Sequence, residues 1–150
     1  GKVLSNGDMS ITLTDDFTNN ATVQAAKNLT LRSSGNVTNN AKILSGATNS
    51  INAQNITNVA GAEISGGTTQ IKANDAVTNR GLMDGNKTVI TGNTVTNLGT
   101  GRIYGTHLSV GASTVNNQGE NVNGKTTTGT IAARERLDIG AQTINNLSGG

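Results

Sequence analysis

A repeat of about 20 residues runs along the whole chain and constrains its fold more than any other feature. The clearest unit is an apolar residue followed by Thr or Asn and then by Asn, as in Val77-Thr78-Asn79. A fixed period of this length is typical of proteins built from stacked structural repeats. The last Asn of the unit recurs at intervals of 20, 19, 21, 18, 20 and 29 residues, at Asn19, Asn39, Asn58, Asn79, Asn97, Asn117 and Asn146.

Two further segments recur in phase with this unit. One is short and apolar and often ends in Gly, as in Ile43-Leu44-Ser45-Gly46. The other alternates apolar and polar residues, as in Ile71-Lys72-Ala73, and such alternation places apolar side chains on one face of a strand. Three short strands in about 20 residues are too few for a propeller blade. We therefore predict an all-β parallel β-helix (solenoid) of about seven coils of about 20 residues, with three short strands per coil.

The composition fits a thin, regular core. Ile, Val, Leu and Phe supply 32 of the 150 residues, and the formal net charge is only +2, whereas disordered chains usually combine low hydrophobicity with high net charge. A disordered secreted tract remains the alternative. The absence of Cys excludes disulfides and Cys-based zinc sites. No apolar run reaches the roughly 18–20 residues of a membrane span, and the scattered positive charge is not the pattern of a nucleic-acid partner.

The recurring Asn predicts a ladder of stacked side chains through all seven coils. Asn tolerates a left-handed backbone at turns, and identical amides stacked coil on coil can hydrogen-bond to one another and to the turn backbone. Asn97→Ala should then destabilise the fold by about 1–3 kcal/mol, because neighbouring groups lose their partners. The alternative interpretation is that Asn only marks solvated turns.

The longest interval predicts an excursion from the coil at residues 121–130. Asn123-Gly124 is a strong signal for a tight turn, so a small hairpin fits this segment. Loops that leave a regular scaffold often carry function. A neutral insertion, which a solenoid tolerates at little cost, is the alternative interpretation.

The sequence predicts no catalytic site, no metal site and no cofactor. Its nine acidic residues occupy no common column of the repeat, and Asp15-Asp16 is the only adjacent pair, placed in a solvated turn or at a weak cation site. His107 is the only His, which excludes a site with several His ligands. A polysaccharide-active β-helix enzyme, which needs clustered carboxylates, is the less favoured alternative.

Four residues form a candidate partner surface. Tyr104 and His107 point outward by alternation with their apolar neighbours, and Arg134 and Arg136 belong to the densest charge cluster. These side chains either contact a partner or form a self-neutralised exposed face.

The coil that runs from Val77-Thr78-Asn79-Arg80-Gly81 to Ile90-Thr91-Gly92, and the segment from Thr130 to Gly140, resemble the haemagglutinin repeats of filamentous haemagglutinin-like exoproteins. That group includes the toxin-delivery proteins of contact-dependent growth inhibition. The resemblance covers essentially all seven coils. It implies a right-handed β-helical filament that is secreted to the bacterial cell surface through an outer-membrane two-partner secretion transporter.

The resemblance also implies a role and partners. Residues 1–150 are expected to be a single β-helical segment inside a longer filament, and this segment would act as a non-enzymatic shaft that extends a distal binding region or toxin. Direct binding of a glycan or a target-cell receptor is the alternative. Neither end of the segment shows an evident cap, so end-to-end self-association is expected as well.

Overall fold

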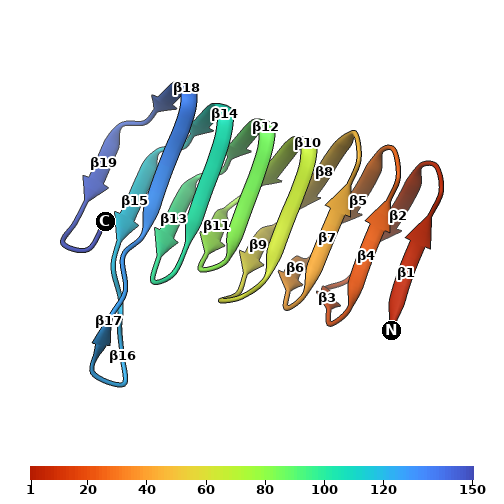
Figure 1. Cartoon of the computed structure of the whole chain (residues 1–150), viewed down its shortest axis with the longest axis horizontal. Helices are drawn as coiled ribbons and strands as arrows, with labels where there is room; N and C mark the ends of the chain where they lie inside the picture. The colour runs from red at the N-terminus through yellow and green to blue at the C-terminus, as the bar shows by residue number, and fades with distance from the viewer.

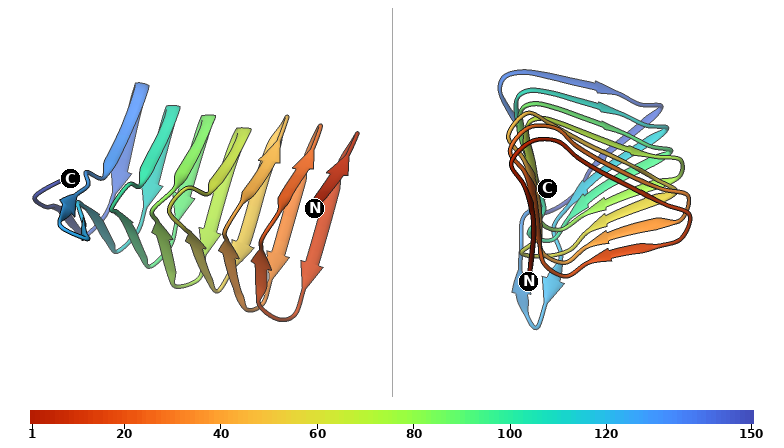
Figure 2. Two further views of the ribbon diagram at one scale, coloured as in Figure 1. Left: turned by 60° about the horizontal axis from the view of Figure 1, so that its bottom comes forward. Right: turned by 90° about the vertical axis from the view of Figure 1, so that its right-hand side faces the viewer.

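The computed structural model describes residues 1–150 and consists of strands and turns without any helix (Figure 1). The chain winds into coils that stack along one axis, and the view down this axis shows a triangular outline (Figure 2). In Figure 1 the front strands run upward and the rear strands downward while the coils advance away from the N-terminus, which makes the solenoid right-handed. The predicted all-β, right-handed parallel β-helix is confirmed.

One side of the triangle is a parallel sheet to which every coil contributes one short strand. Its register joins like residues of successive repeats, since Ile56 pairs with Val77 and Val77 pairs with Val95. About six turns separate its first and last strands, in agreement with the predicted coil number and length. In chain order its strands are β3 (Phe17–Asn19), β6 (Asn36–Asn39), β9 (Asn55–Asn58), β11 (Ala76–Asn79), β13 (Thr94–Leu98), β15 (Thr114–Gln118) and β19 (Thr143–Asn146).

The other two sides form one folded parallel sheet that turns a corner. In the first three coils each side has its own strand: β1 (Lys2–Ser5), β4 (Thr22–Ala25) and β7 (Lys42–Ser45) on one side, and β2 (Met9–Leu13), β5 (Leu29–Ser33) and β8 (Thr48–Ala53) on the other. In the later coils a single bent strand covers both sides: β10 (Glu63–Ala73), β12 (Leu82–Thr91), β14 (Arg102–Gly111) and β18 (Thr130–Gly140). Three separate strands per coil, as predicted, therefore describe only the first part of the solenoid.

Glycine makes the continuous corner of β10 and β12 feasible. Gly66 in β10 pairs with Gly85 in β12 at the bend, so the ladder continues through the corner. A Cβ atom at Gly85 would lie 2.8 Å from the carbonyl oxygen of Lys87 and 3.0 Å from that of Gly66. Real Cβ atoms do not approach backbone this closely, so the bend of β12 requires a residue without a side chain. In β18 the residue opposite Gly105 is Ala133, and the pairing of β14 with β18 shifts register between Gly105 and His107.

The core is a single aliphatic column along the axis. Twenty buried apolar residues form one cluster, and each coil adds a layer, as Ile43, Ile64, Met83 and Ile103 do at successive positions of one side. A lone coil could not bury these side chains, so the stability comes from stacking on its neighbours. This arrangement explains how a chain with few apolar residues can still form a continuous core.

A small hairpin leaves the rod between β15 and β18 (Figure 1). Its strands β16 (Asn121–Val122) and β17 (Lys125–Thr126) are antiparallel. The two turn residues, Asn123 and Gly124, both have positive φ, at 52° and 78°, as a two-residue hairpin turn of this kind requires. The chain returns to the solenoid at Thr130.

Candidate functional site

The seven recurring Asn side chains lie in one column inside a corner of the solenoid. The Nδ2 atom of each donates a hydrogen bond to the Oδ1 atom of the next, at 2.9 Å for the first five steps and 3.0 Å for the last. The four interior rungs from coil two to coil five are fully buried. The column contains Asn19, Asn39, Asn58, Asn79, Asn97, Asn117 and Asn146.

The four interior rungs from Asn39 to Asn97 also hold the turn that follows each of them and the neighbouring coil. Asn79 is representative: its Nδ2 donates to the carbonyl oxygens of Gly81 at 3.0 Å and Arg102 at 3.2 Å, and its Oδ1 accepts from the Gly81 N–H at 3.2 Å. One buried amide therefore satisfies backbone groups of two coils.

The backbone reason expected for these Asn residues is wrong. The only non-glycine residue with positive φ in the chain is Asn123 of the hairpin, so no Asn of the column has a left-handed backbone. Each column residue is the last or the next-to-last residue of a strand of one sheet, and the extended backbone there directs the amide inward. Asn is needed at these positions because its side chain hydrogen-bonds inside the corner, and not because of its turn conformation.

A second buried polar column lies at the corner formed by Gly66 and Gly85, which we call the glycine corner. The sequence analysis did not predict this column. Asn49, Thr69 and Thr88 pair in register and are fully buried. Each donates a side-chain hydrogen bond to a carbonyl oxygen of the next coil, at 3.0, 2.7 and 2.8 Å respectively. The intervals of 20 and 19 residues were visible in the sequence, but the residue type changes along the column.

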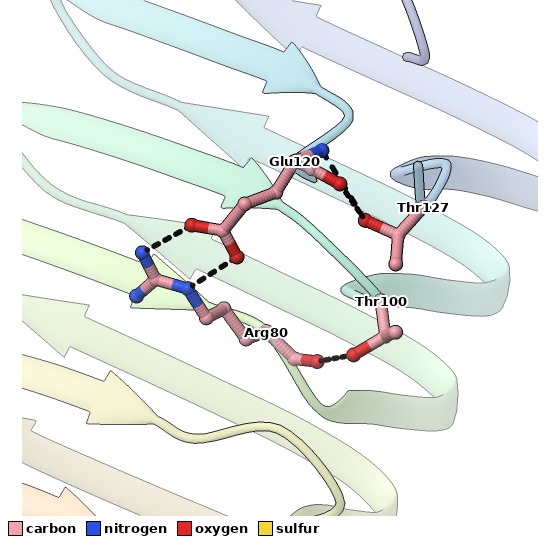
Figure 3. A network of polar contacts seen from close by, with 4 residues as sticks. All are labelled: Arg80, Thr100, Glu120 and Thr127. Atoms are coloured by element: carbon pink, nitrogen blue, oxygen red, sulfur yellow. Dashed lines mark hydrogen bonds and ion pairs between the residues drawn. The ribbon is translucent and has the colours of Figure 1, made fainter. Parts of the chain in front are cut away.

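An ion pair fixes the base of the hairpin to the rod (Figure 3). Arg80 follows β11 and donates from Nε and Nη2 to the two carboxylate oxygens of Glu120, at 3.1 and 3.0 Å. Such two-pronged pairs are the strongest exposed charge pairs in proteins. The hydrogen bond between the two side chains raises the pKa of Arg80 and lowers the pKa of Glu120, against the opposing effect of burial.

Two threonines complete this network (Figure 3). The Thr100 hydroxyl donates to the carbonyl oxygen of Arg80 at 2.7 Å, and the Thr127 hydroxyl donates to the carbonyl oxygen of Glu120 at 2.9 Å. The Thr127 N–H bonds the same Glu120 carbonyl at 2.9 Å. The hairpin therefore leaves the rod in a defined direction.

A groove of about 680 Å³ lies beside the hairpin base. The positive side chains that line it come from the rod and the hairpin, and Tyr104 of β14 is its one aromatic residue. We call this space the hairpin groove. Its lining residues are Gly61, Arg80, Gly81, Thr100, Arg102, Tyr104, Lys125, Thr126, Thr127, Thr128 and Thr130.

The four residues of the candidate partner surface lie on β14 and β18 but do not form one cluster. Tyr104 and Arg134 line a second, adjoining hollow, and Arg134 contacts Asp84 at 3.4 Å. His107 and Arg136 are paired across the two strands, where the register shifts between Gly105 and His107. His107 contacts Glu135 at 3.2 Å and Arg136 contacts Asp138 at 2.8 Å, so acidic neighbours engage both.

Six of the nine acidic side chains cap turns or form ion pairs. The Asp16 carboxylate accepts a hydrogen bond from the Asn36 N–H at 2.8 Å, and thereby caps a turn of the next coil. No group of three or more His, Asp or Glu side chains is arranged to hold a metal ion. The structure also has no helix with the length and apolarity needed to cross a membrane.

The comparisons with known proteins give one match. Residues 1–41, about the first two coils, match the family model of the haemagglutinin repeat. No curated protein and no solved structure matches the chain. The resemblance to haemagglutinin repeats predicted from the sequence is confirmed by this match together with the solenoid fold. The family points to a secreted, structural or adhesin-type surface protein rather than to an enzyme.

Proposed function

Starting from the haemagglutinin repeat, we propose that this chain is a shaft segment of a large secreted bacterial exoprotein of the adhesin type. In this role the segment is a rigid spacer that holds the distal part of the filament at a distance from the cell. In this proposal the distal part is a receptor-binding region or a toxin of the contact-dependent growth inhibition type. The whole protein leaves the cell through a two-partner secretion transporter in the outer membrane.

The observation that carries the proposal is the unbroken coupling of every coil to the next. Parallel backbone ladders join successive coils on all three sides, and the Asn column adds a buried hydrogen bond at each of its six steps. In such a stack each coil contacts only its neighbours, so length grows by a constant step of about 4.8 Å per coil without altering the fold. A shaft needs this property and needs no localised site.

An in-phase insertion tests the proposal. A second copy of residues 20–97 placed after Asn97 adds four coils in register, because Asn97 then precedes the inserted Asn39 by the ordinary interval of 20 residues. We expect an intact β spectrum and a longest dimension, by small-angle X-ray scattering, that grows by about 19 Å.

The matched control inserts residues 30–97 at the same place. This insertion puts the next Asn of the repeat only 10 residues after Asn97, so the Asn column and the core stripe lose their phase. We expect this variant to lose stability. An in-phase variant that folds without lengthening would contradict a shaft built by additive stacking.

A further inference from the structure

The hairpin groove carries two positive charges that no acidic side chain neutralises. Arg80 is occupied by Glu120, but Arg102 on β14 and Lys125 on β17 take part in no ion pair. Both side chains are exposed, one on the wall formed by the rod and one on the wall formed by the hairpin. A ligand between these walls would therefore meet positive charge from two sides.

The rest of the lining is rich in hydroxyl groups and poor in hydrophobic residues. Five threonines line the groove, at Thr100, Thr126, Thr127, Thr128 and Thr130, and Tyr104 is its only hydrophobic residue. A groove that binds a peptide usually offers several hydrophobic side chains to it, and this one offers a single hydrophobic residue. Hydroxyls and a single aromatic ring suit a ligand that is itself a hydroxylated ring.

The hairpin wall is held in place before any ligand arrives. The Arg80–Glu120 pair and the three hydrogen bonds between Thr127 and Glu120 fix its base, and Asn123-Gly124 forms a tight turn at its tip. A wall that is already ordered loses little entropy on binding. The volume of about 680 Å³ also lies within the range of about 300–1,000 Å³ that is typical of small-ligand pockets.

From these observations we infer that the hairpin groove binds an acidic oligosaccharide. Arg102 and Lys125 bind the carboxylate or sulfate groups of the sugar, Tyr104 packs against a sugar ring, and the threonine hydroxyls bond its hydroxyl groups. The inference is independent of the shaft role, because the groove belongs to the hairpin and to the outer surface of the last coils.

The test is isothermal titration calorimetry of the chain at low salt with three ligands, each of six units. The probes are oligogalacturonate, which is an acidic sugar, maltohexaose, which is a neutral sugar, and hexaglutamate, which is an acidic peptide. We expect oligogalacturonate to bind with one site per chain and the other two to bind at least about tenfold more weakly. The affinity should fall as salt is added, because the charges are exposed.

Single substitutions localise the site. Lys125→Gln and Arg102→Gln should each weaken oligogalacturonate binding by about fivefold, as loss of one exposed charge-assisted contact does. Tyr104→Leu keeps the charges and should also weaken the binding of this sugar. The matched control is Lys72→Gln, which removes an exposed cation of β10 that lies outside the groove and should leave the affinity unchanged.

Three outcomes would overturn the inference. The first is the absence of saturable oligogalacturonate binding. The second is an equal loss for Lys72→Gln and Lys125→Gln, which would mean diffuse attraction along the rod. The third is hexaglutamate binding as tightly as the sugar, which would make the groove a site for acidic peptides. Lys125 lies in an exposed hairpin strand, so its variant is expected to fold like the parent chain.

Discussion

Replacing Asn97 by Ala removes one interior rung of the Asn column. Its side chain is fully buried and takes part in four hydrogen bonds. Its Nδ2 donates to Asn117 Oδ1 at 2.9 Å, to the Gly101 carbonyl at 3.0 Å and to the Thr130 carbonyl at 3.2 Å. Its Oδ1 accepts from Asn79 Nδ2 at 2.9 Å.

The size of the effect follows from these partners. The two N–H groups of the amide serve three acceptors, so two of the four contacts share one hydrogen, and a net value of about 1 kcal/mol for each contact sets an upper value of about 4 kcal/mol. The Asn79 amide keeps two acceptors, the carbonyl oxygens of Gly81 and Arg102, so its loss is partial. We expect Asn97→Ala to lower the free energy of unfolding by about 3 kcal/mol.

Two further variants make the measurement specific. Asn146 is exposed and its side chain only accepts one bond, from Asn117 at 3.0 Å, so Asn146→Ala should cost less than about 1 kcal/mol. Asn97→Asp keeps the shape but puts an acceptor oxygen where three acceptors already face it. Because this charge would be buried with only the Asn79 amide as a donor and with three acceptors facing its second oxygen, Asn97→Asp should destabilise more than Asn97→Ala at neutral pH.

The assay is urea unfolding followed by far-ultraviolet circular dichroism, with the midpoint and slope compared between variants. Equal losses for Asn97→Ala and Asn146→Ala would refute the reasoning, because the two sites differ in burial and in the number of bonds. A loss below about 1 kcal/mol for Asn97→Ala would refute it as well.

Two other predictions concern the corner and the hairpin. Gly85→Ala places a Cβ atom 2.8 Å from the Lys87 carbonyl oxygen and should destabilise the fold by about 1–3 kcal/mol in the same assay, whereas Gly140→Ala, which meets no atom within 4 Å, should not. Acidification should release the hairpin base, because the hydrogen bond with Arg80 lowers the pKa of Glu120 below its ordinary 4.5. The ion pair therefore stabilises the fold fully above that value. This stabilisation is lost as the pH falls through the lower pKa that Glu120 has in the folded state. The amide resonances of the hairpin should show this transition in an NMR titration, and Glu120→Gln should abolish it.

The parts of the structure that repeat could be predicted from the sequence. A stack requires like residues at like positions, so units such as Val77-Thr78-Asn79 give both the strand and its register. The hairpin turn was also readable, because Asn123-Gly124 is a local signal that needs no knowledge of the fold. The backbone role assigned to the column Asn was wrong, since a turn propensity cannot tell whether the side chain faces solvent or the interior of a corner.

The parts that do not repeat needed the structure. The column at the glycine corner uses Asn49 and then Thr69 and Thr88, so a search for identical residues passes over it. Arg80 and Glu120 lie 40 residues apart, and the hairpin that brings them together breaks the period at that point. The bend of β12 depends on the close approach of backbone atoms at Gly85, which the sequence shows only as Gly.

The central claim, a rod that gains one constant step per coil, is tested most directly by distances between spin labels. The chain has no Cys, so pairs of introduced cysteines can be labelled cleanly. Thr18 lies in one register column with Thr96, Asn116 and Asn145, at four, five and six coils. We expect distances from Thr18 that rise by about 4.8 Å per coil, near 19, 24 and 29 Å before the label lengths are added. Distances that do not increase in this order, or that spread over a broad range, would contradict the stacked rod.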